Sequence, residues 1–364
     1  MSEWKNCTLG DLGEVVGGGT PSTKKPEYYG GDIAWITPKD LSTFSGRFIK
    51  HGERNITEEG LKGSSARLMP KNTILFSSRA PIGYVAIAEN QVSTNQGFKS
   101  IVPNYDTDYL FLYYLLKFNK DKIENMGSGT TFKEVSGKTV KAIDVTVPSN
   151  KEKQHEIAKI LGSLDDKIEN NRKINHHLEQ IAKAIFYEKF GNQVPNGLLG
   201  DLASVSSGKR PPIKVSERTA TEDIPILGAA SIMGYTSKSL YSEKILVTGR
   251  VGTHGIIQRY NRPCWPSDNA LVLKSDDYEL VYQNLLSIDF SSMNRGSTQP
   301  LITQTDLKNV AIYIPTQIEL SDFEDTVGTI MQQYESNIVA NESLVQLRDS
   351  LLPKLMSGEI SVTD

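Results

Sequence analysis

Two stretches of the chain have the hydrophobic period of a long helix. In residues 157–185, apolar or amide side chains recur at alternating intervals of four and three, and residues 323–351 repeat the pattern 166 positions later. A 4-3 spacing sustained over about four heptads is typical of a coiled-coil seam. The predicted seam positions are Ile157, Leu161, Leu164, Ile168, Asn171, Asn175 and Leu178 in the first helix, and Phe323, Val327, Ile330, Tyr334, Asn337, Asn341, Leu344 and Leu351 in the second.

Each seam carries two asparagines at matching places. A buried amide without a partner costs about 1 to 3 kcal/mol, so the asparagines are expected to face each other. If the two helices run antiparallel, with Ile157 and Phe323 both at d positions, the amides meet in pairs. The alternative is that they face solvent on two unrelated helices. The expected contacts are Asn171 with Asn341, Asn175 with Asn337, Ile168 with Leu344 and Leu178 with Tyr334.

The segments before the two helices repeat each other. Leu9-Gly10-Asp11-Leu12 returns as Leu199-Gly200-Asp201-Leu202, and residues 74–79, 93–95 and 129–131 have counterparts at 245–250, 267–269 and 296–298. Each copy combines turn-rich segments, short β-branched runs and one apolar helical stretch, which predicts a small α/β domain.

The predicted fold is therefore α/β: two similar globular domains separated by two long helices that form an antiparallel coiled coil, with a pseudo-twofold internal repeat. The predicted segments are a first domain at 1–150, a first spacer helix at 151–190, a second domain at 191–317 and a second spacer helix at 318–364.

Composition excludes several classes of protein. With 38% hydrophobic and 23% charged residues the chain can form ordered cores, and its longest apolar run, residues 109–116, is too short to span a membrane. The first residues do not resemble a signal peptide, and Cys7 and Cys264 form no CxxC motif, so we expect a cytoplasmic protein without disulfides or a cysteine zinc site. The net charge of -3 conceals an acidic last segment, 318–364, which carries nine acidic against two basic residues.

No catalytic or metal site is expected. Residues 136–139 read Ser-Gly-Lys-Thr, but Phe132 occupies the place where a phosphate-binding loop needs glycine. The Gly17-Gly18-Gly19 run does not open a helix, and the five histidines have no metal-ligand spacing. Asp165 and Asp166 are expected on the solvated flank of the first long helix.

The order domain, helix, domain, helix resembles the specificity (S) subunit of type I restriction-modification systems, the HsdS family. The resemblance covers essentially the whole chain. It is carried by residues 9–12 with 19–22, by the Gly-Ser/Thr-Thr segments at 129 and 296, by residues 160–171 and by residues 351–360.

The resemblance implies a non-catalytic subunit that confers DNA sequence specificity. Each target-recognition domain would read one half of a bipartite double-stranded DNA target, while the helices set the spacing and dock two adenine-methylating M subunits and, where the system also cleaves DNA, restriction (R) subunits. S-adenosylmethionine would be the cofactor of the M subunit, and this chain would hold none. Residues 157–185 would span about 42 Å as a helix, a little over one turn of B-DNA at about 34 Å.

The candidate DNA contacts lie in turns and loops of the two domains. Arg79 and Arg250 stand at matching places, and arginine is the commonest reader of guanine, although both could equally brace the surface or core. The loop lysines suit phosphates or solvent, and the loop amides suit adenine or turn caps. The candidates are Thr20, Ser22, Lys24, Lys25, Arg79, Asn95, Gln96, Thr130, Thr131, Lys133, Lys209, Arg210, Arg250, His254, Asn269, Arg295, Ser297, Thr298 and Gln299.

Two other functions remain open at this point. The chain could be a coiled-coil adaptor that organises protein partners without reading DNA, or an enzyme with an unrecognised site. Strong, salt-sensitive and sequence-dependent DNA binding would exclude the adaptor, and methyltransferase activity of the isolated chain would reveal the enzyme.

Overall fold

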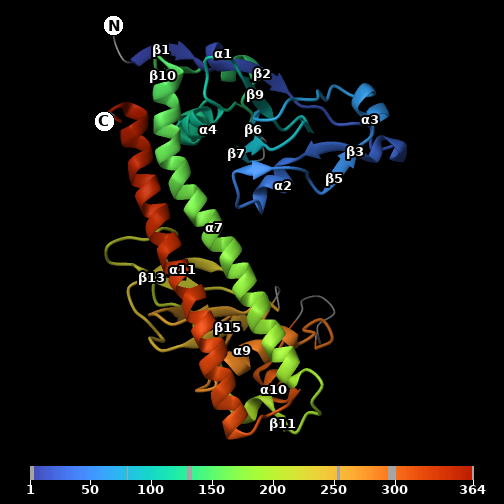
Figure 1. Ribbon diagram of the computed structural model, residues 1–364, viewed down its shortest axis with the longest axis vertical. Helices are drawn as coiled ribbons and strands as arrows, with labels where there is room; N and C mark the ends of the chain where they lie inside the picture. Colours follow the sequence, from blue (N-terminus) through green and yellow to red (C-terminus); the bar gives the residue numbers. More distant parts are fainter. Residues whose placement is uncertain (1–3, 80, 129–132, 252–254, 294–300, 363–364) are drawn as a thin grey trace. The chain divides into compact units, whose positions relative to one another are not determined.

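The computed structural model describes residues 4–79, 81–128, 133–251, 255–293 and 301–362 (Figure 1). The chain forms two compact units, and each is described by itself. Unit 1 comprises Met1–Asn171 and Val339–Asp364, and unit 2 comprises Arg172–Ile338. Each unit therefore contains one globular part and segments of both long helices, α7 (Lys151–Phe190) and α11 (Gln317–Ser357).

The globular part of unit 1 is built on two sheets and a short strand pair. The larger sheet has the order β2-β9-β6-β7-β4, the smaller one β5-β3-β8, and β1 pairs with β10. The strands are β1 (Trp4–Thr8), β2 (Gly13–Gly17), β3 (Tyr29–Ile36), β4 (Phe48–Ile49), β5 (Arg54–Ile56), β6 (Ile74–Ser78), β7 (Ile82–Ala88), β8 (Val92–Thr94), β9 (Lys99–Pro103) and β10 (Asp144–Pro148). The short helices are α1 (Leu9–Leu12), η1 (Pro26–Tyr28), α2 (Pro38–Ser42), α3 (Glu58–Lys62), α4 (Tyr109–Phe118), α5 (Lys120–Asn125) and α6 (Gly137–Lys141).

Helix α4 fills the core of unit 1. It begins at Asp108, whose carboxylate accepts a hydrogen bond from Phe111 N, a side-chain oxygen bond that satisfies one free donor of the first turn. Its residues 111–116 are all buried, among them Phe111 and Leu112 in the same cluster as Ile74 and Phe76 of β6. A helix that is apolar on most sides suits a position between a sheet and another helix. The first turns of α7 belong to the same core, through Ile157, Ala158 and Leu161.

Unit 2 repeats this plan. Its larger sheet has the order β12-β18-β15-β16, its smaller sheet β14-β13-β17, and β11 pairs with β19. Each smaller sheet holds one parallel pair, β3 with β8 and β13 with β17. The strands are β11 (Gly197–Leu198), β12 (Ser204–Ser207), β13 (Ile224–Leu227), β14 (Ile232–Thr236), β15 (Ile245–Gly249), β16 (Gln258–Tyr260), β17 (Trp265–Pro266), β18 (Ala270–Lys274) and β19 (Ala311–Ile312), and the helices are α8 (Leu199–Leu202), α9 (Tyr278–Ser287) and α10 (Gln304–Lys308). The predicted mixed α/β class is confirmed; the division into four segments stays a prediction.

The long helices contribute to the domain cores as well as to each other. In unit 2, Phe323, Val327 and Met331 of α11 are fully buried with Phe186 and Phe190 of α7. The rings of Phe190 and Phe323 lie 5.3 Å apart. Met331 was not among the predicted seam residues because it lies off the 4-3 pattern, on a face that a globular part covers. A seam pattern read from sequence therefore finds only one of the two buried faces.

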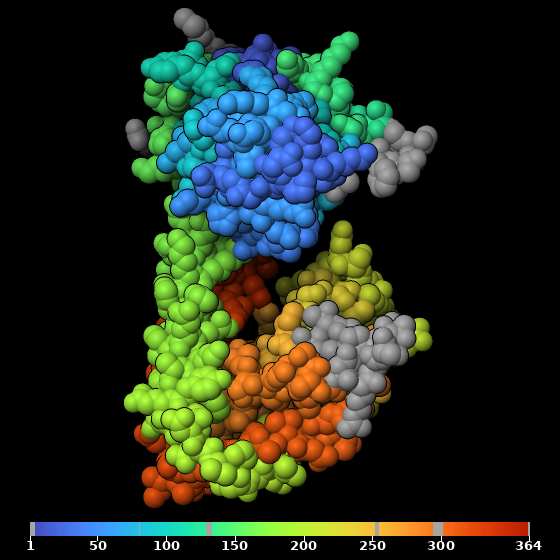
Figure 2. Space-filling model, turned by 90° about the vertical axis from the view of Figure 1, so that its right-hand side faces the viewer, coloured from blue at the N-terminus to red at the C-terminus, as the bar shows by residue number. Residues whose placement is uncertain are grey.

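One face of α7 remains uncovered (green in Figure 2). Ile160, Ile174 and Ile181 are more than a third exposed there, as is Leu347 on α11. Among the helices of the described residues, none is long and apolar enough to cross a membrane.

A carboxylate of α11 caps helix α9 in unit 2. Glu324 accepts hydrogen bonds from Leu280 N at 2.8 Å and from Glu279 N at 3.2 Å. Burial raises the pKa of the Glu324 carboxyl to about 7, against the opposing effect of these two N–H donors, and the neighbouring carboxylates of Glu279 and Asp277 add to the rise in pKa.

This raised pKa predicts a loss of stability between mildly acidic and neutral pH. Folded protein keeps Glu324 protonated to about pH 7, whereas unfolded chain releases the proton near its ordinary pKa of 4.5. Because the folded state binds more protons in this window, the free energy of unfolding should fall as pH rises through it. Urea unfolding at about pH 5 and about pH 8 should show the fall in wild type and a smaller one in Glu324→Gln. Asp325→Asn, an exposed change on the same helix, is the control; an equal fall in all three proteins would contradict the assignment.

Candidate functional site

The opening loop of unit 1 lies against the loop that carries Asn95. Gly19 N donates to Thr94 O at 2.9 Å, and Trp35 Nε1 donates to Gly19 O at 3.0 Å. A Cβ atom at Gly18 would lie 1.9 Å from Asn95 O, so only glycine permits this approach. Two predicted segments, 76 positions apart at Thr20 and Gln96, thereby meet, and the Thr20 hydroxyl donates to Gln96 Oε1.

The turn after β6 joins the same cluster. Ser78 N donates to Gly97 O at 2.8 Å, and Val135 N donates to Ser78 O at 2.9 Å. Glu134 pairs with Lys99 at 3.2 Å and lies 3.7 Å from the Arg79 guanidinium. The structure thus brings the opening loop, the Arg79 turn, the Asn95 loop and the segment next to Lys133 to one place in unit 1.

Unit 2 assembles the equivalent segments in the same way. Gly208 N donates to Ala270 O at 3.0 Å, and a Cβ atom at Gly208 would lie 2.2 Å from Ser267 O. Arg250 N donates to Asn269 O, and Arg250 O accepts from Ile302 N, at 2.8 and 3.0 Å. We call these two sets of segments the loop clusters of unit 1 and unit 2.

An indole holds the opening loop in both units, but from different strands. Trp35 belongs to β3, and its N–H donates to the carbonyl of Gly19. Trp265 belongs to β17, the counterpart of β8, and donates to the carbonyl of Lys209 at 2.8 Å. Gly19 and Lys209 stand at the same place in the two copies of the opening loop. The loop position is therefore shared between the copies, while the residue that fixes it is not.

The side chains of the predicted contacts fall into three groups. Several already have partners: Asn95 Oδ1 accepts from Gly97 N and so caps a turn, Lys25 Nζ donates to the Tyr28 hydroxyl, and Arg79 lies beside Glu134. Others are at the surface of their unit, with Arg250 half-buried and Ser22, Lys24, Lys133, Lys209, Arg210 and Asn269 exposed. Outside the described residues lie Thr130, Thr131, His254, Arg295, Ser297, Thr298 and Gln299.

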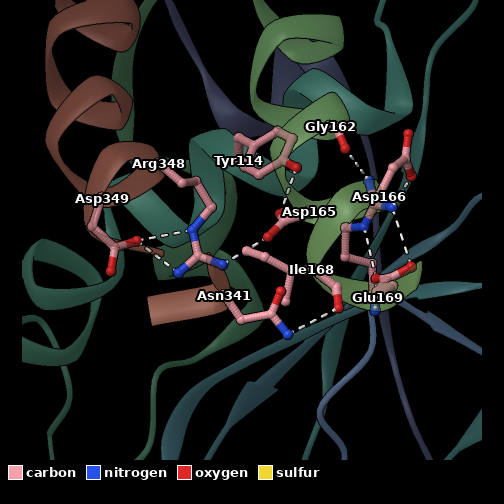
Figure 3. A network of polar contacts seen from close by, with 10 residues as sticks. Tyr114, Gly162, Asp165, Asp166, Ile168, Glu169, Asn341, Arg348 and Asp349 are labelled. Atoms are coloured by element: carbon pink, nitrogen blue, oxygen red, sulfur yellow. Dashed lines mark hydrogen bonds and ion pairs between the residues drawn. The ribbon is translucent and has the colours of Figure 1, made fainter. Parts of the chain in front are cut away.

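The paired seam asparagines are present as expected from the sequence. In unit 1, Asn171 Nδ2 donates to Asn341 Oδ1 at 2.9 Å. Asn341 Nδ2 also donates to Ile168 O at 3.4 Å (Figure 3). In unit 2, Asn337 Nδ2 donates to Asn175 Oδ1 at 2.8 Å. Of the other seam positions, Ile157, Leu161, Ile168, Phe323 and Val327 are buried, and Leu164, Leu178, Ile330, Tyr334, Leu344 and Leu351 are half-buried.

Asp165 does not lie on a solvated flank, which corrects the expectation from the sequence. Its carboxylate accepts from Arg348 Nη1 at 2.7 Å and from the Tyr114 hydroxyl at 2.6 Å, and the side chain is buried (Figure 3). The reason is that α4 packs against this turn of α7, which the helical period alone does not reveal. Burial and the charge of Asp165 raise the pKa of the Tyr114 hydroxyl, so this group donates rather than ionises.

Each unit also buries an arginine between its sheet and a long helix, which the sequence analysis did not find. In unit 1, Arg47 Nε donates to Glu169 Oε1 at 3.0 Å. In unit 2, Arg259 Nη2 donates to Glu335 Oε1 at 2.9 Å. Arg47 and Glu169 are 122 positions apart in sequence, and Arg259 and Glu335 are 76 apart. No local sequence motif therefore predicts either pair.

Each copy of the duplicated α/β unit thus carries one cluster of polar loops. Among the described residues, no group of three or more histidine, cysteine or acidic side chains is arranged to hold a metal ion.

The chain belongs to the family described as the type I restriction modification DNA specificity domain, which matches residues 1–180 and again residues 196–345. It is 34% identical to the type I restriction enzyme MjaIX specificity subunit of Methanocaldococcus jannaschii, over 100% of this chain and 94% of that protein. It is 22% identical to the HindI specificity subunit of Haemophilus influenzae, over 99% and 100% of the two chains. In fold it is similar to the crystal structure of the type I restriction-modification S subunit from M. genitalium, with a TM-score of 0.57, 20% identity and coverage of 97% and 96%.

The adjacent glycines of the opening loop provide a sharp test of the unit 1 loop cluster. Gly18→Ala should lower the free energy of unfolding by about 1 to 3 kcal/mol, because the methyl group would collide with the backbone of Asn95. Gly17→Ala is the matched control, since a Cβ there meets no atom within 4 Å and should change stability by less than about 0.5 kcal/mol. Urea unfolding of both variants would decide; equal stability of the two would contradict the packing described.

Proposed function

We propose that this chain is the DNA-specificity subunit of a type I restriction-modification assembly and that each loop cluster reads one half of a bipartite double-stranded DNA target. The observation that carries the proposal is the duplicated loop cluster, in which segments with hydrogen-bonding side chains meet in each unit. The family match to both halves of the chain supports the same proposal.

Within each loop cluster, the arginine and amide side chains are the proposed base readers and the exposed lysines the proposed phosphate contacts. Arg79 and Arg250 occupy equivalent turns, and Asn269 is exposed beside Arg250. Glu134 would lose its partial contact with Arg79 when that guanidinium turns to a base, and would keep Lys99 as a partner.

Helices α7 and α11 are proposed to pair as an antiparallel coiled coil that sets the distance between the two half-sites. The Asn171–Asn341 and Asn337–Asn175 pairs support this role, because polar residues in a helical seam fix its register. One pair lies in each unit, and residues 171 and 175 correspond to 337 and 341 in the repeat, as a pseudo-twofold arrangement requires.

The partners proposed are two methyltransferase subunits, with restriction subunits in a system that also cleaves DNA. The exposed apolar residues of the helices, such as Ile174, Ile181 and Leu347, suit docking to protein. S-adenosylmethionine would bind in the methyltransferase subunit, and this chain would contribute no catalytic group. A coiled-coil adaptor would use the same helices but has no need of two loop clusters.

Mapping of methylated adenines tests the proposal directly. The chain is co-expressed with its methyltransferase subunit in a host free of adenine methylation, and modified adenines are located across the genome. We expect a split motif, with two short defined parts separated by a fixed run of unspecified bases. A continuous motif would contradict reading by both units, and a stable complex without any motif would favour the adaptor.

Helix length should control spacer length alone. Insertion of one heptad in α7 after Lys173 and one in α11 after Val339 keeps the antiparallel register and lengthens the helix pair by about 10 Å, or about three base pairs. The methylated motif should gain about three unspecified bases and keep both half-sites. Altered half-site bases with an unchanged spacer would contradict a spacer role for the helices.

A further inference from the structure

Each unit holds one buried arginine that ties its larger sheet to a long helix. Arg47 and Arg259 each have side chains only 5% exposed. A buried charge of this kind is tolerated only with well-placed partners, and both arginines have them. These contacts are called the clamps of unit 1 and unit 2.

The clamp of unit 1 joins the edge of the sheet to α7. The guanidinium of Arg47 donates to Glu169 Oε1 at 3.0 Å and to Glu169 Oε2 at 3.2 Å, and it also pairs with Asp166. The backbone N of Arg47 donates to Glu169 as well, while its carbonyl accepts from Ile87 N of β7 at 2.7 Å. Arg47 thus links the edge of the larger sheet, through β7, directly to α7.

The clamp of unit 2 joins β16, the edge strand of the described larger sheet, to α11. Arg259 lies in β16, opposite Leu246 of β15, and donates to both carboxylate oxygens of Glu279 at 2.5 and 2.7 Å. The same guanidinium donates to Glu335, whose other oxygen accepts from Asn261 Nδ2 at 2.7 Å. Tyr278 and Tyr282 lie against its faces, with ring centroids 4.8 and 4.6 Å away.

The two helix carboxylates are equivalent, but the two arginines are not. Glu169 and Glu335 are related by the same shift of 166 that relates the helices, and each stands two residues before a paired seam asparagine. Arg47 precedes β4, whereas the described sheet of unit 2 ends at β16, the counterpart of β7. At the place of Arg259, β7 carries Ala86. The same helix position is therefore held by an arginine just before β4 in unit 1 and by one within β16 in unit 2. This difference points to a requirement on the helix contact rather than to inheritance of one residue.

From this geometry we propose that Arg47 and Arg259 are positioning residues that fix the angle of each DNA-reading domain on its helix, and thereby the spacing between half-sites. This inference rests on the proposed function. The clamp of unit 1 lies at one end of β7, and the Arg79 turn precedes the other end. Seven residues of strand make a lever of about 20 Å. A rotation of about 10° at the clamp moves the far end by about 3.5 Å, close to the rise of one base pair at about 3.4 Å.

Arginine is suited to this task because its planar guanidinium can hold two oxygens in a fixed geometry, which restricts rotation as well as distance. In unit 1 the fork holds Glu169 of α7 directly. In unit 2 it holds Glu279 of α9, and the same Nη2 donates to Glu335 of α11. Lysine would keep the positive charge but lacks the planar group that makes two parallel hydrogen bonds. The clamps should therefore govern how sharply spacer length is discriminated, while the identity of the bases is read elsewhere, in the loop clusters.

The test uses the full chain in complex with its methyltransferase subunit. Duplex DNAs carry both half-sites of the mapped motif, with the spacer at its natural length or one base pair longer or shorter, and the methylation rate is measured on each. Glu169→Gln and Glu335→Gln should each lower the preference for the natural spacer by about tenfold. Single-base changes within either half-site should be discriminated as in wild type. Glu53→Gln and Glu243→Gln break the exposed pairs Lys39–Glu53 and Lys274–Glu243 in the two units and serve as matched controls.

The outcomes separate a positioning role from a structural one. A uniform loss of methylation on all spacers, with the preference unchanged, would overturn the proposal, because a merely structural contact affects every DNA alike. Where a glutamine variant fails to fold, Arg47→Lys and Arg259→Lys decide in the same assay, since they keep the buried charge and lose the two-pronged geometry. If wild type itself shows no split target, the proposed function fails and this inference fails with it; a split target with unaltered spacer preference in the variants overturns the inference alone.

Discussion

The pairing of buried charge between sheet and helix is the constraint on which the rest of each unit depends. Arg47 and Arg259 are both withdrawn from water, and an unpaired charge in such a place would cost several kcal/mol. Each finds its partner on an element distant in sequence, so the domain can close on its helix in one arrangement. In unit 1 the two-pronged pair of Arg47 with Glu169 restricts rotation as well as distance.

This constraint explains why the long helices cannot be understood as a spacer alone. The seam asparagines pair helix with helix, and the carboxylates two positions earlier, Glu169 and Glu335, pair helix with sheet. On each helix, two residues of the same turn thus contact the other long helix and the globular part. A change in how the helices pair would therefore be passed to the domain, and with it to the loops that are proposed to read DNA.

The sequence predicted those features that recur at a fixed period. Once the two helices were taken as antiparallel, the 4-3 spacing with matched asparagines was sufficient to predict which amides pair, since each would otherwise be buried without a partner. The repeat predicted that the Arg79, Asn95 and opening-loop segments are counterparts of Arg250, Asn269 and residues 207–211, and the structure brings them together in each unit. Asp165 and Met331 were misjudged or missed for a common reason: the helical period shows which faces are apolar, but not where a globular part covers a further face. The contacts of Arg47 and Arg259 with the long helices had no signal at all, since the helix carboxylates that accept them lie more than 70 positions away.

The two copies share the positions of certain contacts even where the residues that make those contacts differ. An indole from β3 in one unit and from β17 in the other holds the same carbonyl of the opening loop. Arginines at different places in the sheet hold the equivalent carboxylate of the long helix. Under the proposed function the loop clusters differ because they recognise different half-sites, and the loops are then free to diverge only if their platform stays fixed. The contacts that fix the platform need a donor of the right shape at the right place, whichever strand supplies it. Selection on position rather than on residue would produce this pattern of conserved carbonyl and carboxylate acceptors with exchanged donors.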